Sequence, residues 1–347
     1  MHTSAQHSSD SYPIFDWLRF VLASAVVLTH AGAGWWGNVG DFSVCVFFSL
    51  SGWLIGGILL KTNAPELPKF FFNRSIRIWI PYAVAIALLY GLAAAREGMN
   101  EHFFKFLFYD LTFTHYWFIP KVPEVTNLMP LKGSGAMFWS ISVEEQFYLL
   151  APLVILFAPK GRSILVWGAL SLLALALNYH YASIALGVLA AVCRSQFGNW
   201  HFAGFNRLAL WTITVGSIFA ITASASLYQV FVPVAAIGIV LLCALEGKRS
   251  NLGQLIGGVS YPMYLNHYLG IFIGNALGKF FSLHSTLKIS LSYIFAVGVG
   301  LVLYLAVDRW VLQHKQSAYS DARGKTVMIT AYELIGLGVA LHFLVFK

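Results

Sequence analysis

Long apolar runs separated by short polar connections dominate the chain. Most of these runs hold about 20 residues, which is the length that an α-helix needs to cross the hydrocarbon layer of a membrane. The pattern predicts an all-α protein, a polytopic bundle of membrane-spanning helices. We expect spans near residues 14–32, 42–60, 76–95, 138–158, 162–178, 180–196, 208–225, 228–246, 255–276, 288–307 and 326–346.

One further apolar run, residues 103–119, is interrupted by Lys105, Asp110 and His115. Such a run either spans the membrane or enters it and returns on the same side. If it does not span and the N-terminus is cytoplasmic, roughly two basic residues lie on the cytoplasmic side for each one outside, as the positive-inside rule expects. We therefore predict ten spans, an eleventh at the C-terminus, and a cytoplasmic N-terminus.

Composition excludes several other classes of protein. Of the 347 residues, 58% are hydrophobic and 10% are charged, whereas a soluble domain carries about 25% charged residues. Cys45, Cys193 and Cys243 all lie inside apolar runs, which argues against a secreted disulfide scaffold. The net charge of +8 is spread in small groups between apolar segments, so we expect the lipid bilayer, and no nucleic acid, as a partner.

Two ionisable residues fall within the first span. Charged groups at membrane depth cost about 2.5 to 3.5 kcal/mol on insertion scales, so each is a candidate site residue. Arg19 and His30 are separated by nearly three helical turns, which places them on one face at roughly 16 Å from each other. Histidine titrates near neutral pH and suits a general base. The alternative is that Arg19 extends to the interface and His30 is a hydrogen-bonded packing residue.

A pair of arginines opens the third span. Arg74 and Arg77 stand three residues apart, so their guanidinium groups share one helix face at the predicted cytoplasmic end. Paired guanidinium forks bind phosphate well. They can equally contact lipid head groups as positive-inside anchors.

Further polar groups lie in later spans. Glu144 and Glu145 open the 138–158 span, and adjacent helical positions diverge by about 100°, so at most one points straight into the bundle. Such a carboxylate can orient a histidine or bind an acceptor hydroxyl, or it can be a solvated interfacial residue. His267 lies inside the 255–276 span, where it is either a packing residue or part of a site.

Five segments in chain order resemble the acyltransferase-3 family of integral-membrane acyltransferases. They are Arg19-x10-His30, the Ser-Leu-Ser-Gly-Trp-Leu-Ile segment 49–55, Arg74-x-x-Arg77, the Trp-Ser-Ile-Ser-Val-Glu-Glu-Gln-Phe-Tyr segment 139–148, and the Ser-Tyr-x-x-Tyr-Leu-x-His segment 260–267. Many members carry Asp where this chain has Cys45, and Asp41 is a candidate substitute.

The resemblance implies an enzyme that moves an acyl group, commonly acetyl, from cytoplasmic acyl-CoA to a hydroxyl of a glycan or related acceptor at the outer side of the plasma (inner) membrane. Residues 1–312 would form the acyltransferase domain, and residues 313–347 a cytoplasmic linker and an extra C-terminal transmembrane helix. Because acyl-CoA is a co-substrate, we expect no permanently bound cofactor and no metal. The sequence does not indicate an oligomeric state.

The resemblance also implies residue roles. His30 would remove the acceptor proton, directly or by way of an acyl-histidine intermediate, and Glu144 would orient His30 or the acceptor. Arg74 and Arg77 would bind the nucleotide phosphates of CoA, and Arg19 the pantetheine-phosphate end. The candidate acceptor-binding residues are Trp35, Trp36, Trp117 and His267.

A polytopic transporter or flippase for a glycan or small solute is the alternative, because intramembrane Arg, His and Glu also serve as substrate or proton sites. Transporters are often built from inverted repeats with corresponding broken helices. We find no such pair of segments in the two halves of the sequence. Arginines toward one face and a histidine toward the other favour an enzyme with two substrates.

Overall fold

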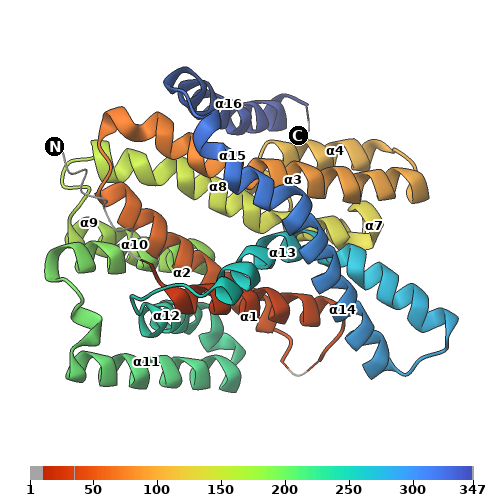
Figure 1. Ribbon diagram of the computed structural model, residues 1–347, viewed down its shortest axis with the longest axis horizontal. Coiled ribbons are helices and arrows are strands. Elements are labelled where there is room, and N and C mark those ends of the chain that lie inside the picture. The colour runs from red at the N-terminus through yellow and green to blue at the C-terminus, as the bar shows by residue number, and fades with distance from the viewer. Residues whose placement is uncertain (1–10, 35, 346–347) are drawn as a thin grey trace.

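The computed structural model describes residues 11–34 and 36–345, and over these residues the chain folds into helices without a strand (Figure 1). The predicted all-α fold class is confirmed. The long helices are α1 (Pro13–His30), α2 (Val39–Leu60), α3 (Leu67–Glu97), α8 (Trp139–Pro152), α9 (Ile164–Leu177), α10 (Tyr179–Phe197), α11 (Gly204–Ala223), α12 (Ala225–Cys243), α13 (Asn251–Phe280), α14 (Ser285–Leu303), α15 (Arg309–Ala318) and α16 (Asp321–Val345).

Eight described helical segments are long and apolar enough to cross a membrane, which supports a polytopic membrane protein. They are Pro13–His30, Val39–Leu60, Ala64–Glu97, Pro130–Phe157, Gly204–Ala223, Ala225–Cys243, Ser285–Ala318 and Asp321–Val345. Helices α10 and α13, with 19 and 30 residues, also have sufficient length. Helix α9 is apolar but has 14 residues.

The ambiguous run 103–119 is divided between two short helices, α4 (Glu101–Leu111) and α5 (His115–Phe118). Helix α4 rises about 16 Å, roughly half the thickness of the hydrocarbon layer. Phe113, with φ of 54°, turns the chain between them. These features support the prediction that the run does not span. Two further short helices, α6 (Pro123–Thr126) and α7 (Pro130–Gly133), lead into α8.

Helices α1 and α13 run parallel, side by side, although more than 200 residues separate them in the sequence. Near the start of α1, the Asp16 carboxylate accepts two hydrogen bonds from Arg249, one from Nε to Oδ2 at 2.6 Å and one from Nη2 to Oδ1 at 2.5 Å. Gly257 makes room for Asp16, since a Cβ there would lie 2.7 Å from its Oδ1. At the end of α1, His30 contacts His267. We call the side on which α1 begins the entry face, and the side on which it ends the exit face.

Glycines let α2 and α10 touch through their backbones. A Cβ on Gly52 would lie 2.1 Å from the carbonyl oxygen of Ile184, and one on Gly187 would lie 2.3 Å from that of Ser49. Small residues at such positions allow close helix packing in membranes. The contact fixes α2 between α10 and the centre of the bundle, so that α2 contributes side chains both to the interior and to the exit face.

Helix α16 lies against α3 on the opposite side of the bundle from α11 (Figure 1). Gly324 packs on the backbone of Pro68, and the Tyr332 hydroxyl donates a hydrogen bond to the carbonyl oxygen of Leu149 at 3.0 Å. Near its C-terminal end, Gly338 packs against Thr112 and Thr114. Helix α16 thus contacts the short segment that joins α4 to α5.

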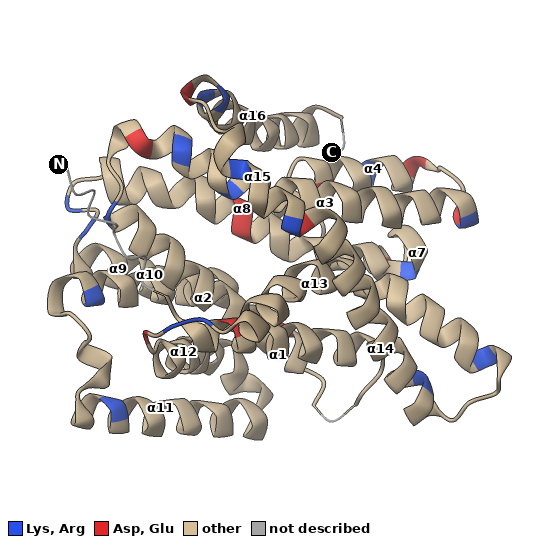
Figure 2. Ribbon diagram, in the orientation of Figure 1, with Lys and Arg blue, Asp and Glu red and all other residues tan. Residues whose placement is uncertain are grey.

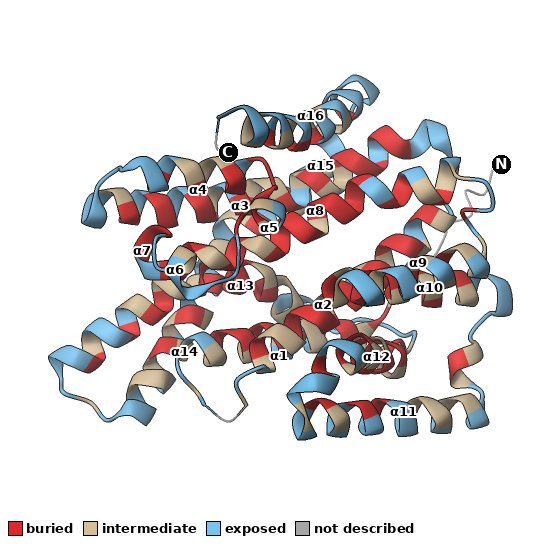
Figure 3. Ribbon diagram, turned by 180° about the vertical axis from the view of Figure 1, so that it is seen from behind, coloured by how far each residue is buried: buried red, intermediate tan, exposed pale blue. Residues whose placement is uncertain are grey.

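Apolar and charged residues are distributed as a membrane requires. Charged residues gather mainly at helix ends and connections (Figure 2). Large apolar side chains are exposed on peripheral helices (Figure 3), including Leu165 on α9, Phe205 and Phe219 on α11, and Val302 on α14. These surfaces suit contact with lipid tails, which leaves the few interior charged groups as the candidates for function.

Candidate active site

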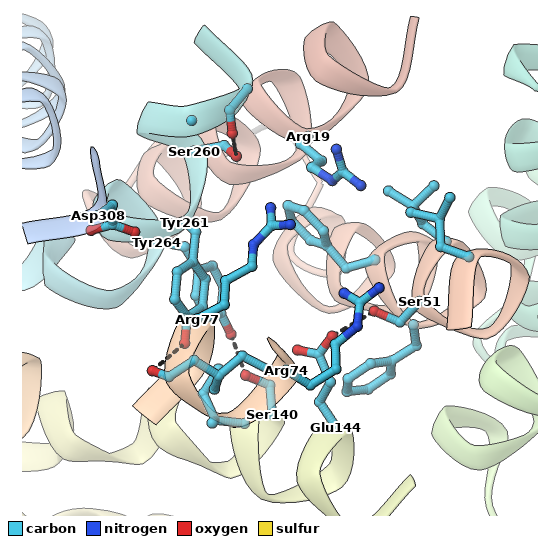
Figure 4. A pocket seen from close by; sticks show the side chains of 18 of the residues that line it. Arg19, Ser51, Arg74, Arg77, Ser140, Glu144, Ser260, Tyr261, Tyr264 and Asp308 are labelled. Atoms are coloured by element: carbon cyan, nitrogen blue, oxygen red, sulfur yellow. Dashed lines mark hydrogen bonds between the residues drawn. The ribbon is translucent and has the colours of Figure 1, made fainter. Parts of the chain in front are cut away.

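A cavity inside the bundle brings together the three arginines that the sequence singled out (Figure 4). Arg19 comes from α1, and Arg74 and Arg77 come from successive turns of α3. Arg19 pairs with Asp16 at 3.6 Å. Of the residues that the structure describes, none forms an ion pair or a side-chain hydrogen bond with Arg74 or Arg77. We call this space the arginine cavity.

Glu144 is the member of the adjacent Glu pair that lines the arginine cavity. Its Oε1 accepts a hydrogen bond from Ser51 Oγ at 2.6 Å and another from the Tyr148 hydroxyl. Glu145 points elsewhere, is buried, and accepts a hydrogen bond from Trp79 Nε1 at 3.1 Å. The two carboxylates therefore have separate environments, as their adjacent positions on a helix predict.

His30 and His267 form a hydrogen-bonded pair at the exit end of α1. His30 Nδ1 lies 2.8 Å from His267 Nε2, and the two rings are nearly parallel at 6°. His267 is fully buried, and its Nδ1 lies 2.6 Å from the carbonyl oxygen of Tyr264. A carbonyl oxygen only accepts hydrogen bonds, so His267 Nδ1 carries the ring proton. In the neutral ring His267 Nε2 is then unprotonated, and it accepts a hydrogen bond from His30 Nδ1–H.

This hydrogen-bond order leaves Nε2 of neutral His30 without a proton. His30 is exposed, and within the described part of the chain its Nε2 has no hydrogen-bond partner. The free lone pair can accept a proton from a ligand hydroxyl, as a general base must. The partner of His30 is thus His267, whereas Glu144 bonds to Ser51 and Tyr148.

Tyr264 connects the histidine pair with the arginine cavity. Its side chain lines the cavity, and its hydroxyl lies 2.6 Å from Ser140 Oγ (Figure 4). Its carbonyl oxygen accepts a hydrogen bond from His267 Nδ1. Its ring also packs edge-on against Phe47, another lining residue. One residue of α13 therefore borders the cavity and fixes the proton position of the histidine pair.

A second pocket opens on the exit face. It is lined by Asp41 at the start of α2, by residues 116–121 in and after α5, and by residues 178–180 at the start of α10. Trp117 is 43% exposed, and its Nε1 donates a hydrogen bond to the Tyr181 hydroxyl at 2.9 Å. We call this space the aromatic pocket.

Trp36, another predicted acceptor-binding tryptophan, is not among the residues that line this pocket. Trp36 packs against Phe42 and Tyr228, at ring-centroid distances of 5.9 and 6.1 Å. Trp35 lies outside the described residues. His267, the fourth member of that set, is buried beneath His30 rather than open to a ligand.

Asp41 and His180 form a polar network in the aromatic pocket that the sequence reasoning did not identify. Asp41 Oδ1 lies 3.0 Å from His180 Nε2, and Oδ2 accepts hydrogen bonds from Tyr179 and Tyr228 at 3.0 and 2.9 Å. Cys45 is close by, and its sulfur lies within 4.8 Å of the Asp41 and His180 ligand atoms. The departure noted at Cys45 was a signal for this region, because Asp41 lies one helical turn before it.

Asp308 is a second residue that the sequence reasoning did not place in the site. It closes the π-helical turn Tyr304–Asp308 and lines the arginine cavity. The Asp308 side chain is buried, and no described residue forms a hydrogen bond with its Oδ2. A carboxylate so placed limits the positive charge that faces the entry side of the cavity.

Comparisons with known proteins agree with this arrangement. An acyltransferase domain family, acyltransferase-3, matches residues 12–307. Nodulation protein 10 of Rhizobium leguminosarum bv. viciae is 24% identical over 78% of this chain and 85% of its own length. Peptidoglycan O-acetyltransferase OatA of Listeria monocytogenes is 26% identical over 77% of this chain, and the alignment covers 50% of that protein.

O-acetyltransferase OatA of Staphylococcus aureus is 31% identical over 42% of this chain and 25% of its own length. The chain thus aligns with half or less of the two OatA proteins. No solved structure matches. The family match covers every segment that carried the resemblance, and with it the prediction of a membrane acyltransferase is confirmed. This chain belongs to the acyltransferase-3 family of integral-membrane acyltransferases.

Proposed function

We propose that this acyltransferase moves an acetyl group from cytoplasmic acetyl-CoA to a hydroxyl of a glycan on the outer side of the plasma membrane. The N-terminus and the entry face are then cytoplasmic. The observation that carries the proposal is the placement of a cationic cavity and of an accessible histidine base at different depths along the same helix, α1. Two substrates approaching from opposite faces would meet between them.

The arginine cavity suits the phosphates of the donor. Its guanidinium groups are planar forks that bind phosphate oxygens in pairs. Arg74 is half-buried, and the described residues supply no partner for it or for Arg77, so an anionic ligand would satisfy both. Arg19, deeper along α1, would contact the pantetheine-phosphate end. The donor is consumed in each turnover, so the proposal requires no permanently bound cofactor and no metal.

His30 is the proposed catalytic base. Its Nε2 takes the proton from the acceptor hydroxyl while the hydroxyl oxygen attacks the thioester carbonyl carbon. The carbon–sulfur bond then breaks, CoA leaves as a thiolate, and the proton passes from His30 to that sulfur. His267 acts as a positioning residue, because it accepts the His30 Nδ1 proton in a hydrogen bond and keeps the ring orientation fixed.

Glu144 is a positioning residue on the donor side. Ser51 and Tyr148 hold its carboxylate in the arginine cavity, where it faces the same space as Arg74. We assign it the placement of the donor rather than of His30. The aromatic pocket would bind the acceptor, with Trp117 stacking on a sugar ring and Trp36 in the connection between α1 and α2.

The test is release of CoA thiol by the purified protein in proteoliposomes, with acetyl-CoA and a cell-envelope glycan extract. We expect release that depends on the glycan and is lost in His30→Ala. His102→Ala is the matched control, because His102 is exposed on α4, away from both sites. Glycan crossing the bilayer without release of CoA would instead establish the transporter alternative.

A further inference from the structure

We infer that the aromatic pocket recognises an acidic glycan, and that Lys121 binds the carboxylate or phosphate group of that glycan. The inference rests on the proposed function, because it names the class of acceptor. It comes from comparing the two charged groups of the pocket. The Asp41 carboxylate accepts several hydrogen bonds, whereas no described residue forms an ion pair or a side-chain hydrogen bond with the Lys121 ammonium group.

The carboxylate in the pocket already has hydrogen-bond donors. Asp41 accepts hydrogen bonds from Tyr179 and Tyr228 at one oxygen and contacts His180 Nε2 at the other. The second ring nitrogen of His180 lies 2.8 Å from the Tyr116 hydroxyl. These three donors hold the Asp41 carboxylate in place, so we assign Asp41 to the wall of the pocket rather than to ligand binding.

Among the described residues, Lys121 has no such hydrogen bonds. Its Nζ lies 3.3 Å from the centroid of the Trp139 ring and 5.1 Å from that of Tyr116. Aromatic faces attract a cation but carry no net charge to neutralise it. The described residues include no carboxylate in an ion pair with Lys121. The side chain is exposed and lines the pocket, so its N–H groups remain available to an anion.

The rest of the pocket suits a sugar ring. The exposed face of Trp117 offers a flat apolar platform, and Asn178 adds an amide that can donate and accept. The pocket also lies next to the catalytic end of α1. A Cβ on Gly40 would lie 3.3 Å from Thr29 Cγ2, so the residue preceding Asp41 packs against the residue preceding His30. A glycan held here would have its hydroxyl groups near the proposed base.

The experiment measures binding without the donor, by saturation-transfer difference NMR on the full-length protein in nanodiscs of zwitterionic phosphatidylcholine. The probes are trigalacturonate, maltotriose bearing a single phosphate monoester, and the methyl-esterified, uncharged form of trigalacturonate. We expect one or both anionic sugars to bind at least tenfold more tightly than the neutral one. Comparing trigalacturonate with the phosphorylated maltotriose shows whether the site prefers a carboxylate or a phosphate.

Substitutions test the role of Lys121 itself. Lys121→Gln should abolish the preference for the anionic sugars, and Lys121→Arg should retain it, because Arg keeps the charge. Lys132→Gln is the matched control, since it removes the same charge from an exposed residue of the same connection outside the pocket. Equal binding of charged and neutral sugars, no binding of any, or an unchanged preference in Lys121→Gln would each overturn the inference.

An anionic lipid head group has the same chemistry as an acidic sugar. Repeating the titration with phosphatidylglycerol in the nanodiscs separates the two sources. Binding that persists supports a glycan site, whereas displacement by phosphatidylglycerol would show that Lys121 contacts lipid and would overturn the inference. Because no thioester is present, these outcomes do not depend on acyl transfer, which the CoA-release assay tests separately.

Discussion

The arginine cavity and the aromatic pocket both contain cations, but they present them differently. The cavity is lined by three arginines, of which Arg19 and Arg74 are half-buried and Arg77 is exposed, and by Glu144 and Asp308. The pocket holds one ammonium group against aromatic rings on the exit face. Several forks suit a ligand with several phosphates, whereas one cation beside flat rings suits a sugar with one acidic group. Under the proposed function, this difference would separate recognition of the donor from recognition of the acceptor.

We expect the largest effect on activity from substitution of His30, which lies between the arginine cavity and the aromatic pocket. His30→Ala should lower kcat about 10²- to 10⁴-fold, the usual contribution of a general base, while the affinities for acetyl-CoA and trigalacturonate stay unchanged. His267→Ala should lower kcat less, because His30 remains. Initial rates of thiol release and two binding titrations check this. A loss of donor affinity in His30→Ala would show that the base and the arginine cavity are not separate.

Arg74→Ala combined with Arg77→Ala should raise the KM for acetyl-CoA about 100-fold through lost charge-assisted hydrogen bonds, and leave binding of trigalacturonate unchanged. Lys69→Ala is the control, because it removes an exposed charge from the same helix outside the cavity. Steady-state kinetics with varied acetyl-CoA measure the effect. If Lys69→Ala raised the KM for acetyl-CoA equally, the effect would come from the overall charge of this helix rather than from contacts in the cavity.

The affinity of the aromatic pocket for an acidic sugar should depend on pH. Although Lys121 is exposed as a residue, partial desolvation of its ammonium group lowers its pKa to about 8, against the opposing influence of Asp41 and Cys45. The ammonium is charged below that pKa and loses its charge as the pH rises through it, so binding of trigalacturonate should weaken up to about tenfold between pH 7 and pH 9. His180, Tyr116 and Trp139 also face this group.

The matched measurement is the same pH series on Lys121→Arg, whose guanidinium stays charged throughout. Its affinity should remain constant from pH 7 to pH 9. A parallel decline in that variant would assign the pH dependence to another group of the pocket.

We expect the smallest effect on acceptor binding from a substitution in α16. A Cβ at Gly338 would lie 2.6 Å from Thr112 Oγ1 and Thr114 Cγ2, so Gly338→Ala must displace the turn that leads into α5 and Trp117. We expect a few-fold weaker binding of trigalacturonate and an unchanged KM for acetyl-CoA. Gly336→Ala is the control, because a Cβ there has open space. Equal changes on the donor and acceptor sides would indicate a general loss of packing.

The sequence predicted helices well where apolar runs define them. The expected span 42–60 corresponds to Val39–Leu60, and 14–32 corresponds to Pro13–His30. The third span was placed at 76–95, but α3 begins at Leu67, because Lys69 and the cavity-lining Arg74 interrupt the apolar run before residue 76. A hydropathy run cannot detect a helical turn whose polar side chains point into a protein.

The site was predictable where its residues share one helix. Arg74 and Arg77 were placed on one face by their spacing, and the structure puts both in the cavity. The partner of His30 was not predictable, since the contact joins residues 237 positions apart. Lys121 was missed for a similar reason, because its environment is created by Trp139 and by the start of α10, and neither follows from local periodicity.

The paired course of α1 and α13 constrains how members of the family can be recombined. These helices are joined by Asp16 and Arg249 at one end and by the two histidines at the other, and Gly257 and Asp16 fit each other closely. A chimera that takes α1 from one parent and α13 from another would mismatch both junctions, even if each helix were correct by itself. When segments are exchanged between relatives, α1 and α13 should therefore be taken from the same parent, although more than half of the chain separates them.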